Sequence, residues 1–153
     1  MALHYAAQSV AFTYNDPTIF AEYAIDTARA CHAKKLRTVA VSAGYICAEP
    51  RREMYAEMDG ANLDLKGFTE DFYWHLTGAH LCDVLETIAH VCNETECWVE
   101  LTTLLIPGHN DSDGEIRNLS NWIVENVGPD VPLHFSAFHP DWKMRDVPRT
   151  PAI

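Results

Sequence analysis

The sequence predicts an α/β protein whose parallel strands form a partial, TIM-like (β/α) barrel. Short runs rich in β-branched residues alternate with segments of ten or more residues whose apolar positions recur at helical spacing. This alternation places helices outside a parallel sheet. About five strand–helix units fit the length of the chain, whereas a complete eight-unit barrel takes roughly 250 residues. We therefore expect one partial-barrel domain over residues 1–140 and an extended, proline-containing tail over residues 141–153.

The first elements make a strand–helix–strand unit. Residues 9–14 (SVAFTY) are a β-rich run. Asp16 then stands where it can cap a helix, and Pro17 suits the first position of that helix. Apolar residues recur at helical spacing through residues 17–34, and residues 38–42 (TVAVS) form the second strand. A connection of this length, passing through a helix, is typical of two parallel strands.

The central stretch of the chain is residues 61–66, Ala-Asn-Leu-Asp-Leu-Lys, which follows a helix expected over residues 50–58. Strand alternation puts the three apolar side chains on one side and Asn62, Asp64 and Lys66 on the other. In a barrel, the polar side would face the lumen. Alternatively, this is a half-exposed strand whose polar side meets water, and periodicity alone does not separate the two interpretations.

The second half of the chain repeats the alternation. The sequence predicts a short helix capped by Thr69 and ending near Gly78. The next helix has its inner stripe at Leu81, Val84, Leu85, Ile88 and Cys92, and a strand over residues 98–106 follows it. A Ser112–Glu115 capping box then opens a further helix, and the last strand is expected over residues 133–138.

Composition narrows the classes of function. The net charge of −11 and the lack of a basic run disfavour nucleic acid and anionic membranes as partners. No apolar run approaches a membrane span, and residues 1–8 do not resemble a signal peptide, so we expect a cytoplasmic protein. The five cysteines, at positions 31, 47, 82, 92 and 97, contain no CxxC pair and are interpreted as reduced, mostly buried thiols.

Chemistry in parallel α/β folds is carried by residues at the carboxyl ends of the strands. That rule selects Tyr14-Asn15-Asp16, Ser42-Ala43-Gly44, Asp64-Leu65-Lys66, Thr103 and His139. Four of these candidates also have a structural explanation: Asp16 as a helix cap, Asp64 and Lys66 as a mutual ion pair, and His139 as a structural histidine.

Two metal-based interpretations are weaker. Residues 109–113 (HNDSD) lack the glycine that a calcium loop needs and fit a turn followed by a capping box. A metal-dependent hydrolase using His134, His139, Asp64 and Asp141 is the remaining alternative. We assign no metal ligands, and the sequence does not identify catalytic residues.

Several motifs occur together along the chain: SVAFTYNDPTIF, ANLDLKGFTEDFY, VELTTLLIPG followed by NDSD, and PLHFSAFHPDWKM. Together they resemble the radical SAM enzymes of the AmmeMemoRadiSam group, which are similar to the activating enzymes of pyruvate formate-lyase. The resemblance implies about five strands of a six-stranded radical SAM core. It also implies S-adenosylmethionine and a [4Fe-4S] cluster as cofactors, which in that family generate a 5'-deoxyadenosyl radical that abstracts hydrogen from a substrate.

The resemblance also implies a set of cofactor-binding residues. Tyr14, Asn15 and Asp16 match the segment that contacts the amino group of S-adenosylmethionine. Ser42 and Gly44 match the turn after the second strand, although Ala43 replaces the usual Asn. Asp64 and Lys66 match the strand at the methionine end of the cofactor, and His139 matches a histidine beside it.

The chain departs from the family in its cysteines. The Cys-x3-Cys-x2-Cys motif that ligates the cluster is absent, as are the first strand and its loop. We therefore expect a fragment, an alternative start or one piece of a split protein that is inactive in isolation. The alternative is a non-catalytic remnant that acts as an interaction module, pairing with itself or with another chain through the sheet edge left open. The protein or small-molecule substrate is unknown.

Overall fold

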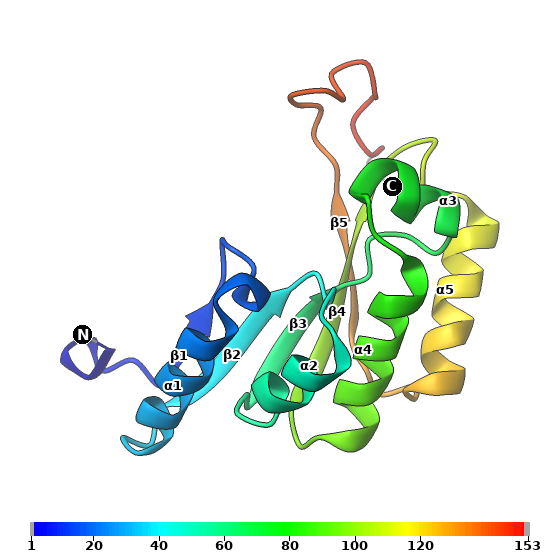
Figure 1. Cartoon of the computed structure of the whole chain (residues 1–153). Helices are drawn as coiled ribbons and strands as arrows, with labels where there is room; N and C mark the ends of the chain where they lie inside the picture. Colours follow the sequence, from blue (N-terminus) through cyan, green and yellow to red (C-terminus); the bar gives the residue numbers. More distant parts are fainter. Residues whose placement is uncertain (1, 152–153) are drawn as a thin grey trace.

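The computed structural model describes residues 2–151 and contains one sheet of five parallel strands in the order β1-β2-β3-β4-β5 (Figure 1). The strands are β1 (Ser9–Phe12), β2 (Arg37–Ser42), β3 (Gly60–Asp64), β4 (Trp98–Leu105) and β5 (Leu133–Ala137). The helices are α1 (Ala21–His32), α2 (Ala48–Tyr55), α3 (Glu70–Phe72), α4 (Leu81–Glu94) and α5 (Asp113–Asn126). Because the strands follow one another in chain order and all run parallel, the predicted partial barrel is confirmed.

Three short helical turns complete the set of elements: η1 (Ala2–Tyr5), η2 (Pro17–Phe20) and the π-helical η3 (Tyr73–Thr77). The predicted helix after Asp16 therefore begins with a 3-10 turn, and the helix predicted from residue 50 begins two residues earlier, at Ala48. Gly78 ends η3 in the left-handed conformation (φ 71°), as the sequence predicted for a helix end there.

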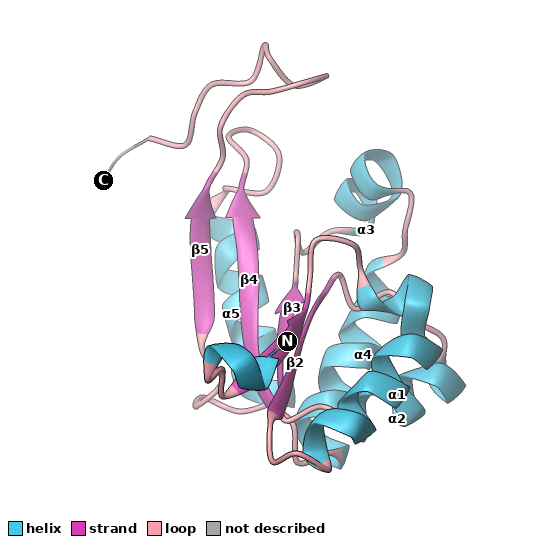
Figure 2. Cartoon of the chain, turned by 90° about the vertical axis from the view of Figure 1, so that its left-hand side faces the viewer, coloured by secondary structure: helices cyan, strands magenta, loops and turns pink. Residues whose placement is uncertain are grey.

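Helices α1, α2, α4 and α5 lie over one face of the sheet (Figure 2). On that face Ala40, Leu63 and Leu101 are fully buried. Val39, Asn62 and Glu100 alternate with them on the opposite face, and each remains partly exposed. The predicted alternation within residues 61–66 is confirmed, because Ala61, Leu63 and Leu65 are all buried while the polar residues between them are not. The face opposite the helices is the one that would point into the lumen of a closed barrel.

Two details differ from the expected helix patterns. In α4, Thr87 and Val91 are fully buried, whereas Leu85 and Cys92 are only partly buried, so the inner stripe is rotated from the predicted one. At α5, the Ser112 side chain accepts from the Glu115 backbone N–H as predicted. The Glu115 carboxylate, however, accepts from the Phe68 N–H at 2.6 Å instead of completing the capping box.

The C-terminal segment folds back on the sheet. The Thr150 hydroxyl donates to the Leu105 carbonyl at 2.6 Å and accepts from the Phe138 N–H at 2.7 Å. These bonds hold the segment against the carboxyl ends of β4 and β5. Among the residues that the structure describes, no helix is long and apolar enough to cross a bilayer.

Candidate functional site at the carboxyl ends of the strands

A cavity of about 290 Å³ lies where β1, β2 and β3 end. Its lining consists of Thr13, Tyr14, Asp16, Val41, Ser42, Ala43, Asp64 and Lys66. Residues from three predicted segments therefore meet around one concave site, because parallel strands bring their carboxyl ends to the same edge of the sheet.

Asp16 is held by three hydrogen bonds. Its Oδ1 accepts from the Thr18 N–H (3.0 Å) and the Ser42 hydroxyl (2.9 Å), and its Oδ2 accepts from the Ala43 N–H (2.8 Å). Burial opposes the charged form, but the hydrogen bonds from Ala43 and Thr18 outweigh it and hold the pKa of Asp16 below its usual value. The carboxylate thus caps η2 and also ties the end of β1 to the end of β2.

Asp64 and Lys66 form an ion pair at the floor of the cavity. Lys66 Nζ lies 2.7 Å from Asp64 Oδ2, and the side chains of Lys66 and Asp64 are 41% and 33% exposed, respectively. A pair with this exposure contributes little to stability, because water competes for both charges. Asp64 and Lys66 can therefore exchange their contact with each other for contacts with a charged ligand at a small cost in free energy.

The backbone beneath this ion pair is fixed more firmly than its side chains. The Lys66 N–H donates to the buried Tyr73 hydroxyl at 3.0 Å. Burial raises the pKa of the Tyr73 phenol, which therefore stays protonated and neutral. The Thr103 hydroxyl donates to the Leu65 carbonyl at 2.7 Å. Thr103 was selected as a strand-end residue, and its hydroxyl binds the backbone immediately after β3.

Asn110 is the residue at this edge that sequence reasoning missed. It is only 2% exposed. Its Nδ2 donates to the carbonyls of Lys66 (2.6 Å) and Leu104 (2.8 Å), while its Oδ1 accepts from the Ile106 N–H (2.7 Å). This amide links the segment after β3 to the end of β4. Within the HNDSD turn nothing distinguishes it from an ordinary turn residue, because the burial depends on the neighbouring strand.

Three other predicted site residues, Asn15, Gly44 and His139, do not line the cavity. Asn15 is exposed beside Tyr14, whose φ of 72° and full exposure mark a tight turn. Gly44 also has a positive φ (70°), and a Cβ there would point toward Thr87 and Val84 of α4. His139 lies beyond β5, where its ring nitrogens contact the Pro140 carbonyl and the Arg149 guanidinium.

The cysteines do not assemble into a cluster site. Within residues 2–151 no group of three or more His, Cys, Asp or Glu side chains could hold a metal ion. Burial raises the pKa of Cys92 to about 11 and that of Cys97 to about 12, which disfavours the thiolate form that metals bind. Cys47 and Cys82 are exposed, and Cys31 is buried in the core.

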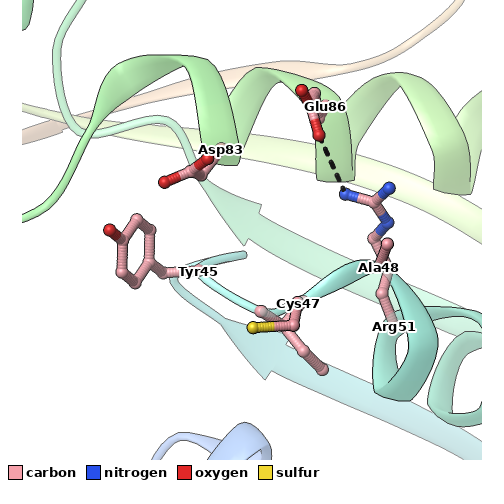
Figure 3. Close-up of a pocket in the computed structure, with 7 residues that line it drawn as sticks. Tyr45, Cys47, Ala48, Arg51, Asp83 and Glu86 are labelled. Carbon is pink, nitrogen blue, oxygen red and sulfur yellow. Dashed lines mark ion pairs between the residues drawn. The ribbon is translucent and has the colours of Figure 1, made fainter.

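A second hollow, of about 330 Å³, lies on the helical side between α2, α4 and the loop after β2. Figure 3 shows Tyr45, Cys47 and Asp83 at one end of it and the Arg51–Glu86 pair at the other. Burial and the nearby Asp83 raise the pKa of Tyr45. The Arg51 guanidinium lies 3.8 Å from Glu86, with its side chain only 10% exposed, so it is largely a structural cation.

Comparison with known sequences gives no family model that matches. The chain is 35% identical over 151 residues to the uncharacterized protein MJ0808 of Methanocaldococcus jannaschii, covering 99% of this chain and 44% of that protein. It is 23% identical over 120 residues to the 4-hydroxyphenylacetate decarboxylase activating enzyme of Clostridioides difficile, covering 76% of this chain and 37% of that enzyme. The chain thus spans less than half the length of these relatives.

Three solved structures share the fold. A domain of a pyruvate-formate lyase-activating enzyme from Bacteroides vulgatus superposes with a TM-score of 0.76 at 16% identity, covering 92% of this chain and 89% of that domain. Streptococcus suis SuiB bound to S-adenosylmethionine gives 0.75 at 14% identity, covering 98% and 34% of the two chains. The radical S-adenosylmethionine methyltransferase TsrM from Kitasatospora setae, with cobalamin and a [4Fe-4S] cluster bound, gives 0.65 at 12% identity, covering 88% and 28%. The chain therefore has the partial-barrel fold of these radical SAM and activating enzymes, in agreement with the fold that its motifs led us to expect.

Proposed function

We propose that this chain forms the S-adenosylmethionine-binding part of a radical SAM enzyme of the activating-enzyme type. The observation that carries the proposal is the cavity in which Asp64 and Lys66 lie beside the loops joined by Asp16. The likeness in fold to SuiB bound to S-adenosylmethionine supports the same ligand class.

The charges in the cavity suit the methionine end of this ligand. A carboxylate and an ammonium moved out of water each need a compensating partner. Lys66 would bind the ligand carboxylate and Asp64 the ligand ammonium, each exchanging its present partner for a ligand group. Asp16 has a different role in this proposal, because both of its oxygens already accept hydrogen bonds. It positions the Ala43 and Tyr14 loops that form the wall.

The residues of this chain do not fit a [4Fe-4S] cluster. No three cysteine side chains come together among residues 2–151, and two of the five thiols have raised pKa values. A cluster serving this cavity would need ligands from outside these residues. We therefore assign the chain a cofactor-binding role and derive no redox step for it.

A second proposed role is self-association through the edge of the sheet. β1 is the terminal strand in the strand order, so within the described residues its outer edge has no strand partner. Its sequence, Ser-Val-Ala-Phe, carries no charge or proline, the features that protect natural edge strands from pairing. A second copy of this chain is the partner we propose for that edge.

The test of the binding role is calorimetry with S-adenosylmethionine. We expect a dissociation constant on the order of micromolar to millimolar. Asp64→Asn and Lys66→Met should each weaken binding about tenfold, since each removes one charge-assisted contact. Asp26→Asn and Lys143→Met are matched controls at exposed positions outside the cavity and should leave the affinity unchanged. Equal affinities for all five proteins would refute the assignment of the site.

A further inference from the structure

A larger cavity, of about 760 Å³, lies at the opposite end of the sheet, where the strands begin. Its lining includes Ser9 at the start of β1, Arg37 at the start of β2, Gly60 at the start of β3 and Trp98 at the start of β4. Its volume falls within the range of ordinary small-molecule sites, roughly 300 to 1,000 Å³. It shares no lining residue with the carboxyl-end cavity.

The cavity is lined by unpaired positive charge. Lys34, Lys35 and Arg37 are all exposed and line it, and they are three of only 11 Lys and Arg residues in a chain of net charge −11. Within residues 2–151 none of the three side chains has an ion pair or hydrogen-bond partner, although carboxylates outnumber cations twofold in the sequence.

The one carboxylate lining the cavity is already engaged. Asp59 accepts from the Thr38 N–H at 2.7 Å and lies 2.9 Å from the His32 ring nitrogen. Asp59 keeps its negative charge and offsets one of the three cations, so the lining as a whole is left with a net positive charge.

An indole ring is held in place beside these charges. Trp98 is 60% exposed. Its Nε1 donates to one oxygen of Glu100 (3.2 Å), and the other oxygen of Glu100 lies 2.8 Å from the His134 ring nitrogen. Trp98 is opposite Gly60 in the strand register, so no side chain from β3 stands beside it. The ring is thus oriented by hydrogen bonds while it remains open to solvent.

We propose that this cavity binds a flat heteroaromatic anion of the nucleotide type, with its ring stacked on Trp98 and its phosphates on Lys34, Lys35 and Arg37. The stacked ring removes exposed apolar surface from water, and such stacking accepts any base because every base has a π-face. The phosphates neutralise cations that the protein leaves without partners. Because the rest of the chain is acidic, the attraction is confined to this cavity and does not extend to a long polyanion.

The proposal is independent of the S-adenosylmethionine site and predicts a ligand without a methionine moiety. The probes are ATP, inorganic tripolyphosphate and adenosine, titrated by calorimetry into the full chain. ATP should bind more tightly than either of the others, because only ATP combines a ring with phosphates.

Two variants separate the contributions of the positive charges and of the indole ring to ATP binding. Replacing Lys34, Lys35 and Arg37 by Gln should weaken ATP binding about tenfold or more, because several close charge pairs are lost. Trp98→Leu should weaken ATP binding about fivefold and leave tripolyphosphate binding unchanged. All four positions are exposed, so the variants should keep the urea midpoint of the wild type.

The matched control lies at the other end of the molecule. Trp142 is also exposed and has Lys143 Nζ 4.3 Å from its ring, with Arg145 close in sequence, but it lines neither cavity. Lys143→Gln with Arg145→Gln, and separately Trp142→Leu, should leave ATP affinity within about twofold. Equal binding of ATP and tripolyphosphate, equal losses in the control variants, or no ATP binding at all would overturn the proposal.

Discussion

Asp16→Ala should destabilise the protein by about 3 kcal/mol, because one side chain holds three segments together. Loss of the helix cap, the bond to the Thr18 N–H, costs about 1 kcal/mol. The bonds to the Ala43 N–H and the Ser42 hydroxyl add about 1 kcal/mol each. Ser42 is 3% exposed, so water does not readily replace its lost acceptor. Urea unfolding followed by circular dichroism measures this free energy directly.

The matched control is Asp26→Ala, which removes a carboxylate that is 81% exposed and whose nearest cation, on Arg29, lies 4.0 Å away. That change should stay within about 0.5 kcal/mol of wild type. A difference of less than about 1 kcal/mol between the two variants would refute the view that Asp16 joins the strand ends.

The same carboxylate gives the stability a pH dependence. Because the pKa of Asp16 is lowered in the folded state, its contribution is present above the unfolded value of 3.8 and is lost as pH falls through the folded value. The stability gap between wild type and Asp16→Ala should therefore be constant near neutral pH and shrink below pH 3.8. A gap that widens on acidification would contradict this sign.

Three further outcomes follow from the structure. Asn110→Ala should lower the free energy of unfolding in urea by about 3 kcal/mol, because three buried hydrogen bonds are lost. Its control, Asn93→Ala, removes a single exposed hydrogen bond and should lower the free energy of unfolding by less than about 1 kcal/mol. Reconstitution with iron and sulfide should leave no stoichiometric [4Fe-4S] cluster on this chain; a four-iron Mössbauer signal that survives desalting would contradict the cysteine geometry. The wild-type chain should form dimers in light scattering that Ala11→Lys on the β1 edge disrupts, and a monomeric wild type at high concentration would argue against edge pairing.

The sequence predicted the fold well because its information is local and periodic. Strand alternation in residues 61–66 identified both faces of β3, and the Asp16-Pro17 pair marked the start of a helical turn. Asp16, Ser42 and Asp64 were predicted to share a site because each follows or ends a parallel strand, and all three line the same cavity.

What the sequence did not predict depends on contacts between distant segments. Asn110 bonds to Lys66, 44 residues away, and Glu115 bonds to Phe68 instead of closing its own capping box. The amino-end cavity likewise joins residues from the starts of four strands, and no single stretch carries its pattern. Spacing along the chain predicts which residues share an edge of the sheet, but not which of them hydrogen-bond to each other.

We propose that S-adenosylmethionine binds at the carboxyl ends of β1, β2 and β3. The most direct test is to follow backbone amide resonances by NMR during titration with S-adenosylmethionine. We expect the largest shifts at Ala43 and Lys66, with little change at Tyr45 in the helical hollow or at Trp98 at the amino end. Shifts confined to those two other hollows, or scattered over the surface, would contradict it.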